Sequence, residues 1–79
     1  MKKILITGAL GQIGTELTMY LRKQYGNDNV VISDIARKGD DSVLESGPFE
    51  ILDVKDGDRL AEICKKYGVR VFIDAARYA

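Results

Sequence analysis

Three glycines stand between an apolar run and an amphipathic segment near the start of the chain. Residues 3–7 form a short, nearly continuous apolar run, which is typical of a strand covered on both faces. Gly8, Gly11 and Gly14 follow, and a helical period begins at Gln12. The order of strand, glycine-rich turn and helix predicts the opening unit of a parallel α/β sheet.

The first expected helix covers residues 12–25. Basic residues in its last turn and Gly26 just beyond it are typical of a helix end. The side chains expected to face the core are Ile13, Leu17, Tyr20 and Leu21, and those expected to form the polar side are Thr15, Glu16, Thr18, Arg22 and Lys23.

The remaining elements follow from the same signals. Residues 30–34 predict a second buried strand and residues 49–52 a short third one, with one helical turn at most, over residues 41–45, in the crossover between them. Asp56 is a good N-cap for a second long helix, and Gly68 can end it. Leu60, Ile63, Cys64 and Tyr67 have helical spacing, so Cys64 and Tyr67 are expected to pack inward. A fourth strand is expected over residues 69–73.

These elements predict an α/β fold in one domain, residues 1–79. The expected fold is a partial Rossmann fold, a parallel sheet of about four strands in the order 3-2-1-4 with helices on its faces.

The glycine segment also predicts a ligand. A glycine at the first position permits a tight turn, the second lets a pyrophosphate approach the backbone, and the third allows close helix packing. The first amides of the helix, at Gln12 and Ile13, suit phosphate oxygens. The alternative is that the three glycines only form a turn.

Asp34 strengthens the dinucleotide interpretation. It ends the second expected strand about 20 residues after the last glycine, where an acid binds the adenosine ribose. A carboxylate there repels a 2′-phosphate and favours NAD over NADP, although Arg37 and Lys38 lie close behind and could hold that phosphate. A solvated strand end is the alternative reading of Asp34.

Composition excludes several other classes. Twelve basic residues balance twelve acidic ones, so bulk charge does not favour nucleic acid or an anionic membrane. The apolar run after the first lysines is too short for a signal sequence or a membrane span. The single cysteine cannot form an internal disulfide. A cytoplasmic protein is therefore expected.

Residues 7–14 have the pattern T-G-x-x-G-x-I-G, which resembles the extended short-chain dehydrogenase family of nucleotide-sugar epimerases and related oxidoreductases. Residues 3–14, 31–35 and 49–54 carry the resemblance, which covers most of residues 1–70. Within the family, these stretches are most similar to the short-chain type of L-threonine 3-dehydrogenase.

The resemblance implies NAD as cofactor and a role for each matching position. Asp53, on this resemblance, would meet the adenine edge; the alternative is an N-terminal cap or turn residue before the second long helix. The implied cofactor-binding residues are Gly8, Gly11, Gln12, Ile13 and Gly14 for the pyrophosphate, Asp34 for the ribose, Leu52, Asp53 and Val54 for adenine, and Ala75 and Ala76 for the nicotinamide side. The family tends to have H-L-A-A after its fourth strand, whereas this chain has Asp74 at the first of these positions and Arg77 at the last.

Catalytic residues of this class are not found in the sequence. The family uses a tyrosine four residues before a lysine, and no tyrosine here has that partner. No metal-ligand cluster is expected either. We therefore expect the N-terminal half of an NAD-binding domain, inactive alone, from an enzyme that oxidises the 3-hydroxyl of L-threonine. The alternatives are part of a nucleotide-sugar epimerase or dehydratase, and a non-catalytic module that self-associates through the exposed edge of its sheet.

Overall fold

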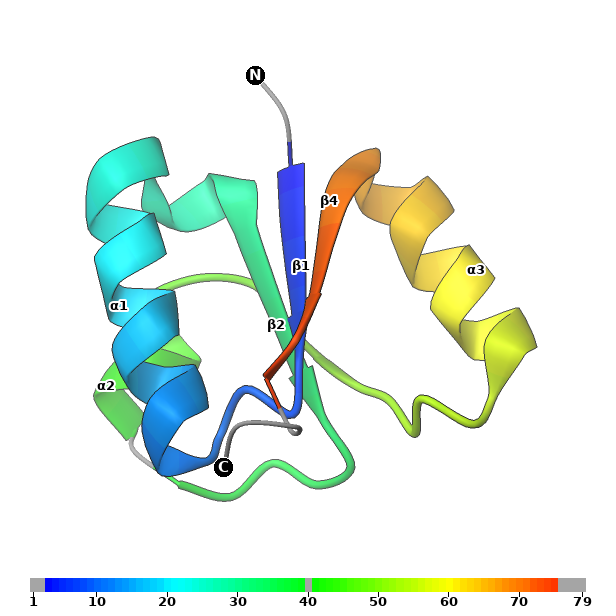
Figure 1. The fold of residues 1–79 in the computed structure, drawn as a ribbon, viewed down its shortest axis with the longest axis horizontal. Helices are drawn as coiled ribbons and strands as arrows, with labels where there is room; N and C mark the ends of the chain where they lie inside the picture. The colour runs from blue at the N-terminus through cyan, green and yellow to red at the C-terminus, as the bar shows by residue number, and fades with distance from the viewer. Residues whose placement is uncertain (1–2, 40, 76–79) are drawn as a thin grey trace.

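A parallel sheet of four strands organises residues 3–39 and 41–75, the part of the chain that the computed structural model describes (Figure 1). The strand order β3-β2-β1-β4 confirms the order expected from sequence. The strands are β1 (Lys3–Thr7), β2 (Val30–Asp34), β3 (Phe49–Ile51) and β4 (Val69–Asp74), and the helices are α1 (Gln12–Tyr25), the 3-10 turn η1 (Asn27–Asn29), α2 (Asp41–Glu45) and α3 (Gly57–Tyr67).

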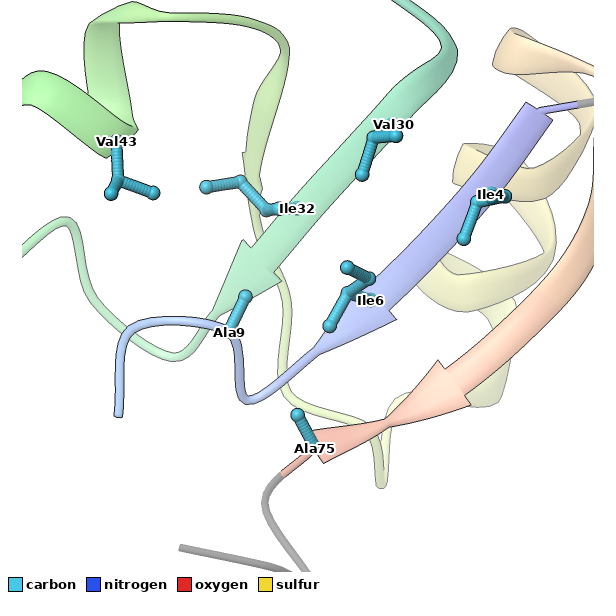
Figure 2. Packing of buried hydrophobic residues seen from close by; sticks show 7 residues of the cluster. All are labelled: Ile4, Ile6, Ala9, Val30, Ile32, Val43 and Ala75. Carbon is cyan, nitrogen blue, oxygen red and sulfur yellow. The ribbon is translucent and has the colours of Figure 1, made fainter. Parts of the chain in front are cut away.

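The two central strands are apolar at successive positions because both of their faces are covered. Leu5 and Ile6 of β1 are both fully buried although they point to opposite faces. On one face, Ile6 and its neighbours pack against α1 and α2, and Figure 2 shows Val43 of α2 turned toward Ile32 of β2. On the other face, Leu5 packs with Ile63 of α3.

Helix α3 begins and ends where its capping residues predict. The Asp56 carboxylate accepts a hydrogen bond from the Arg59 N–H at 3.1 Å, which satisfies one amide of the first turn. Gly68 follows the helix with φ of 67°, a left-handed conformation that L side chains rarely adopt. Cys64 and Tyr67 are partly buried against the Leu5 cluster, in agreement with their expected inward packing.

The expected orientation of α1 is wrong in part. Leu17 and Leu21 pack against the core, but Ile13 is 44% exposed and Tyr20 is 61% exposed. The buried residues of the helix are instead Gly14, Thr18 and Arg22, two of which were expected on the polar side.

Close packing at Gly14 explains why this side of α1, and not the side with Tyr20, faces the sheet. A Cβ at this position would lie 2.7 Å from the Ala9 carbonyl oxygen, so only glycine allows the helix to approach the loop. Thr18 then lies one turn further along the same line and satisfies its hydroxyl on the Gly14 carbonyl at 2.7 Å. Tyr20 is two residues on, about 200° around the helix axis, and therefore faces away from the sheet.

Arg22 ties the irregular crossover to the sheet. Its buried guanidinium donates to the carbonyls of Val30, Val43 and Pro48 and to the Ser46 hydroxyl, at 2.8–3.2 Å. Burial lowers the pKa of Arg22, and the nearby Asp28 carboxylate opposes that shift.

Gly47 makes room for this guanidinium. A Cβ at Gly47 would lie 2.7 Å from the Arg22 Cζ and 2.6 Å from the Asn27 carbonyl oxygen. The segment between β2 and β3 is thus ordered by this buried cation together with the buried Val43 and Leu44 of α2.

Candidate functional site

The loop after β1 brings the glycines together at the carboxyl end of the sheet. Gly8 has φ of 62°, which turns the chain sharply out of the strand. The next N–H, from Ala9, donates to the Ser33 carbonyl at 3.0 Å, and Ala9 itself is fully buried. The loop is therefore fixed to β2 before α1 begins.

The start of α1 presents amides to this end of the sheet. Gly11 occupies the N-cap position in an extended conformation, and among the described residues no side chain caps the first turn. The first turn also carries no acidic residue. Its N–H groups and the positive end of the helix dipole suit a phosphate.

Asp34 links the glycine loop to the end of β2. Its Oδ2 accepts the Leu10 N–H at 3.0 Å, and its Oδ1 accepts the Ile35 N–H at 2.8 Å. These two bonds hold the carboxylate beside the loop, where an acid that binds a ribose is expected.

A cavity of about 280 Å³ opens beside this carboxylate. Its lining combines apolar surface with one acid and one cation, a combination that fits a nucleoside. The lining residues are Leu10, Gly11, Asp34, Ile35, Ala36 and Lys38.

Sequence reasoning missed part of this lining. Leu10, Ile35 and Ala36 were not expected at the site, although Ile35 directly follows the expected ribose acid and is 71% exposed. An apolar residue just beyond a strand that ends in an acid is the signal that would have found it. Of the two cations expected nearby, Lys38 lines the cavity, whereas the Arg37 guanidinium carbon lies 5.5 Å from the centre of the Phe49 ring.

Leu52, Asp53 and Val54 lie at the end of the neighbouring strand β3. Leu52 is buried, and its N–H donates to the Asp34 carbonyl at 2.9 Å. The Asp53 side chain accepts the Lys55 N–H at 3.0 Å, so in this structure it forms the turn that was its alternative interpretation. Val54 is 46% exposed.

The end of β4 completes this edge of the sheet. Ala75 is buried and packs in the same cluster as Ile6 and Ala9 (Figure 2), and Ala76 lies outside the described residues. Asp74 pairs with Thr7 across the sheet and accepts its hydroxyl at 3.2 Å.

The crossovers on either side of β1 lie on opposite faces. Helix α1, which follows β1, packs on the Ile6 face, and α3, which precedes β4, packs on the Leu5 face. The gap between the carboxyl ends of β1 and β4 is therefore the topological switch point, where open α/β sheets bind ligands.

A second polar cluster lies on α3, away from this site. Glu50 of β3 accepts hydrogen bonds from Arg59, Lys66 and Tyr67, all on α3. Burial and the hydrogen bond to Glu50 raise the pKa of Tyr67, the reverse of what a tyrosine base needs. Tyr67 also lies near the amino end of β4, at the opposite end of the sheet from the glycine loop, so this cluster fastens α3 to β3.

Two further features of the described residues bear on the kind of site. Within residues 3–39 and 41–75 no group of three or more histidine, cysteine, aspartate or glutamate side chains could hold a metal ion. Over the same residues, none of the helices has the length and apolar character needed to cross a membrane.

Comparison with known proteins agrees with this geometry. A family model described as the NAD dependent epimerase/dehydratase family matches residues 4–79. An uncharacterized epimerase/dehydratase of Staphylococcus aureus strain USA300 is 57% identical over 67 residues, which are 85% of this chain and 21% of that protein.

Solved structures of two related enzymes are also similar to this chain. L-threonine dehydrogenase from Clostridium difficile superposes with a TM-score of 0.87 at 59% identity, over 94% of this chain and 23% of that one. UDP-glucose 4-epimerase from Brucella ovis in complex with NAD superposes with a TM-score of 0.77 at 28% identity, over 94% and 22%.

This chain thus spans about a fifth of the length of the relatives it matches. The match includes the glycine loop, Asp34 and all four strands. The chain belongs to the NAD-dependent epimerase/dehydratase family.

Proposed function

We propose that this chain binds the adenosine diphosphate part of NAD as the cofactor-binding portion of an NAD-dependent oxidoreductase. The observation that carries the proposal is the Asp34 carboxylate, held by the Leu10 and Ile35 amides beside a cavity of about 280 Å³. A ribose in that cavity would donate its hydroxyls to Asp34, and the pyrophosphate would meet the first amides of α1.

The remaining predicted residues have narrower roles in this proposal. Gly8 and Gly14 shape the loop, while Gly11, Gln12 and Ile13 supply backbone near the phosphates. Leu52, Asp53 and Val54 approach the adenine edge through their backbone. Bound NAD supplies the acceptor for a hydride, and this chain's own residues bind and orient the adenosine half.

Calorimetric titration of NAD and NADP into the purified chain tests the proposal. We expect weak, saturable binding of NAD and weaker binding of NADP, because Asp34 repels a 2′-phosphate. Asp34→Ala should abolish NAD binding, and Asp34→Asn should weaken it while keeping an acceptor for a loop amide. Asp28→Ala, an exposed acid before the amino end of β2, is the matched control and should bind normally. A folded chain that binds neither nucleotide would refute the proposal.

The finer proposal concerns the substrate. The parent enzyme oxidises the 3-hydroxyl of L-threonine, which is supported by 59% identity to the threonine dehydrogenase against 28% to the epimerase. A nucleotide-sugar epimerase or dehydratase is the second candidate, supported by the family description.

Two chimeras would separate these candidates. The chain would replace the matching segment of the Clostridium difficile dehydrogenase in one and of the Brucella ovis epimerase in the other. We expect NAD-dependent threonine oxidation in the first and no sugar-nucleotide epimerisation in the second, because sheet packing is matched to the rest of each enzyme. The opposite pattern, with both chimeras folded, would favour the epimerase.

The isolated chain is proposed to be catalytically inactive. No tyrosine in its sequence is followed four residues later by lysine, and the Tyr67 hydroxyl is engaged by Glu50. Incubation with NAD and L-threonine should give no increase in absorbance from reduced NAD above that of a blank. Measurable turnover would contradict this part of the proposal.

A further inference from the structure

The loop that follows β2 places its two adjacent cations in different surroundings. Residues 34–36 and residue 38 line the cavity beside the glycine loop, so Arg37 is the one residue of this stretch that is not part of the lining. The Arg37 guanidinium carbon lies instead 5.5 Å from the centre of the Phe49 ring. Two side chains of the same charge, Arg37 and Lys38, are therefore directed to different places.

Phe49 is anchored in the sheet, where it can hold this guanidinium. It begins β3, pairs with Ile32 of β2 and packs against the buried cluster that contains Ile32 and Val43. An arginine over an aromatic face within about 6 Å of the ring centre is attracted by the ring. Because the ring is partly buried and Arg37 belongs to an exposed loop, the ring decides where the guanidinium lies.

The backbone of the loop supports this arrangement. The Lys38 N–H donates to the Ala36 carbonyl at 3.1 Å, which closes a tight turn with Arg37 as its middle residue. Gly39 then lies against the glycine loop, since a Cβ at this position would be 3.7 Å from the Leu10 Cβ. The turn thus brings the residues on either side of Arg37 to the cavity and leaves Arg37 at its corner.

We propose that Phe49 is a positioning residue for cofactor choice, because it holds Arg37 away from the ribose and so preserves the preference for NAD over NADP. The proposal rests on the adenosine site proposed above. A 2′-phosphate beside Asp34 needs a cation to offset the carboxylate, and an arginine can bind it through two parallel hydrogen bonds. Arg37 is the arginine nearest to Asp34 in the chain. While it lies over Phe49, Lys38 alone of the two cations faces the cavity.

Removing the ring tests the proposal through the ratio of the NAD and NADP dissociation constants, measured by calorimetry. Phe49→Leu keeps an apolar side chain in the cluster but releases Arg37, so the affinity for NADP relative to NAD should rise about threefold, the contribution of one exposed cation–π contact. Phe49→Tyr, which keeps a ring, is the matched control and should retain the parent ratio. Adding Arg37→Gln to Phe49→Leu should restore that ratio. A purely structural role of Phe49 would weaken both nucleotides alike and leave the ratio unchanged.

The two neighbouring cations provide a second test that leaves the core intact. Lys38→Gln should lower the relative affinity for NADP about threefold, because Lys38 lines the cavity, whereas Arg37→Gln should leave the ratio as it is. The contact itself can be observed without any nucleotide. In NMR spectra of the parent chain, the Arg37 side-chain signals should carry a ring-current shift that is lost in Phe49→Leu.

The outcomes separate this inference from the adenosine site on which it rests. A folded parent chain that binds neither nucleotide would refute the site and the inference together. If NAD binds, three results would each overturn the inference alone: a ratio unchanged in folded Phe49→Leu, a changed ratio that persists after Arg37→Gln is added, or an Arg37 signal with no ring-current shift in the parent.

Discussion

Replacing Arg22 by methionine is expected to destabilise the chain by about 3 kcal/mol, because this guanidinium organises the crossover between β2 and β3. Arg22 is 4% exposed and donates to four acceptor atoms. Methionine fills a similar volume but donates no hydrogen bond. The variant therefore isolates the polar role of Arg22 from its packing role.

The size of this destabilisation depends on which hydrogen bonds each acceptor keeps after the substitution. The Pro48 carbonyl retains the Ile32 N–H at 3.0 Å, and the Val43 carbonyl retains the Ser46 hydroxyl at 3.0 Å. The loss is then at the lower end of the range for a buried acceptor, about 1 kcal/mol each, or roughly 4 kcal/mol over four atoms. Relief from burying a cation offsets about 1 kcal/mol of this. The total free energy of unfolding of a chain of this size is about 4–12 kcal/mol, so the effect is large.

Urea unfolding followed by circular dichroism gives the measurement, with the unfolding free energy from linear extrapolation. Arg22→Lys should recover less than half of the loss, because one ammonium cannot reproduce the fork of five donors. Lys23→Met, at the exposed neighbouring position, is the matched control and should change stability by less than about 0.5 kcal/mol. The reasoning would be refuted if the unfolding free energy of Arg22→Met were within about 1 kcal/mol of the parent's, with an unchanged dependence on urea concentration.

Three further outcomes are expected. Gly14→Ala should lower the free energy of unfolding by about 1–3 kcal/mol or move α1 away from the loop, because its Cβ would lie 2.7 Å from the Ala9 carbonyl oxygen. An unchanged thermal midpoint would contradict the close approach of α1 to the loop. Gly47→Ala should destabilise by a similar amount in the parent but by less in an Arg22→Met background, where the clash with the guanidinium is gone, and double-mutant analysis would detect that coupling. Burial raises the pKa of Glu50, but hydrogen bonds from Tyr67, Lys66 and Arg59 outweigh it and leave this pKa below its ordinary value. Its stabilisation is therefore present above the unfolded pKa of about 4.3 and is lost as pH falls through the folded value. Glu50→Gln should thus be less stable than the parent at pH 7, with a difference that shrinks in acid, and a pH-independent difference would show that its charge is not involved; the exposed Glu62→Gln is the control.

The glycine-rich turn and the bounds of the strands and long helices were accessible from sequence because they depend on local and periodic signals, and the strand order followed from the usual topology of such α/β units. A buried parallel strand needs continuous apolar residues, a tight turn needs a glycine such as Gly8, and a helix end needs caps such as Asp56 and Gly68. Each of these requirements is met within a few residues along the chain. The position of Asp34 at a strand end followed from the same local signals.

The lining of the cavity depended on tertiary structure. Lys38 and Arg37 are adjacent and chemically similar, yet one lines the cavity while the other lies over Phe49. Asp53 likewise has its side chain in a turn, a role that its sequence context allowed but did not select. Only the folding of the segments after β2 and β3 distinguishes these alternatives.

The rotation of α1 is the clearest case in which tertiary structure decided the outcome. Sequence determined that residues 12–25 form a helix, because its period and end signals are local. It did not determine which side faces the sheet, because the charged Arg22 is buried and the aromatic Tyr20 is exposed, the reverse of the usual hydrophobic pattern. The closest approach is set by Gly14 against the loop, and the burial of Arg22 is made favourable by carbonyls from β2 and the crossover. Those acceptors lie 8 to 26 residues away in the chain, and only the folded sheet brings them to one point.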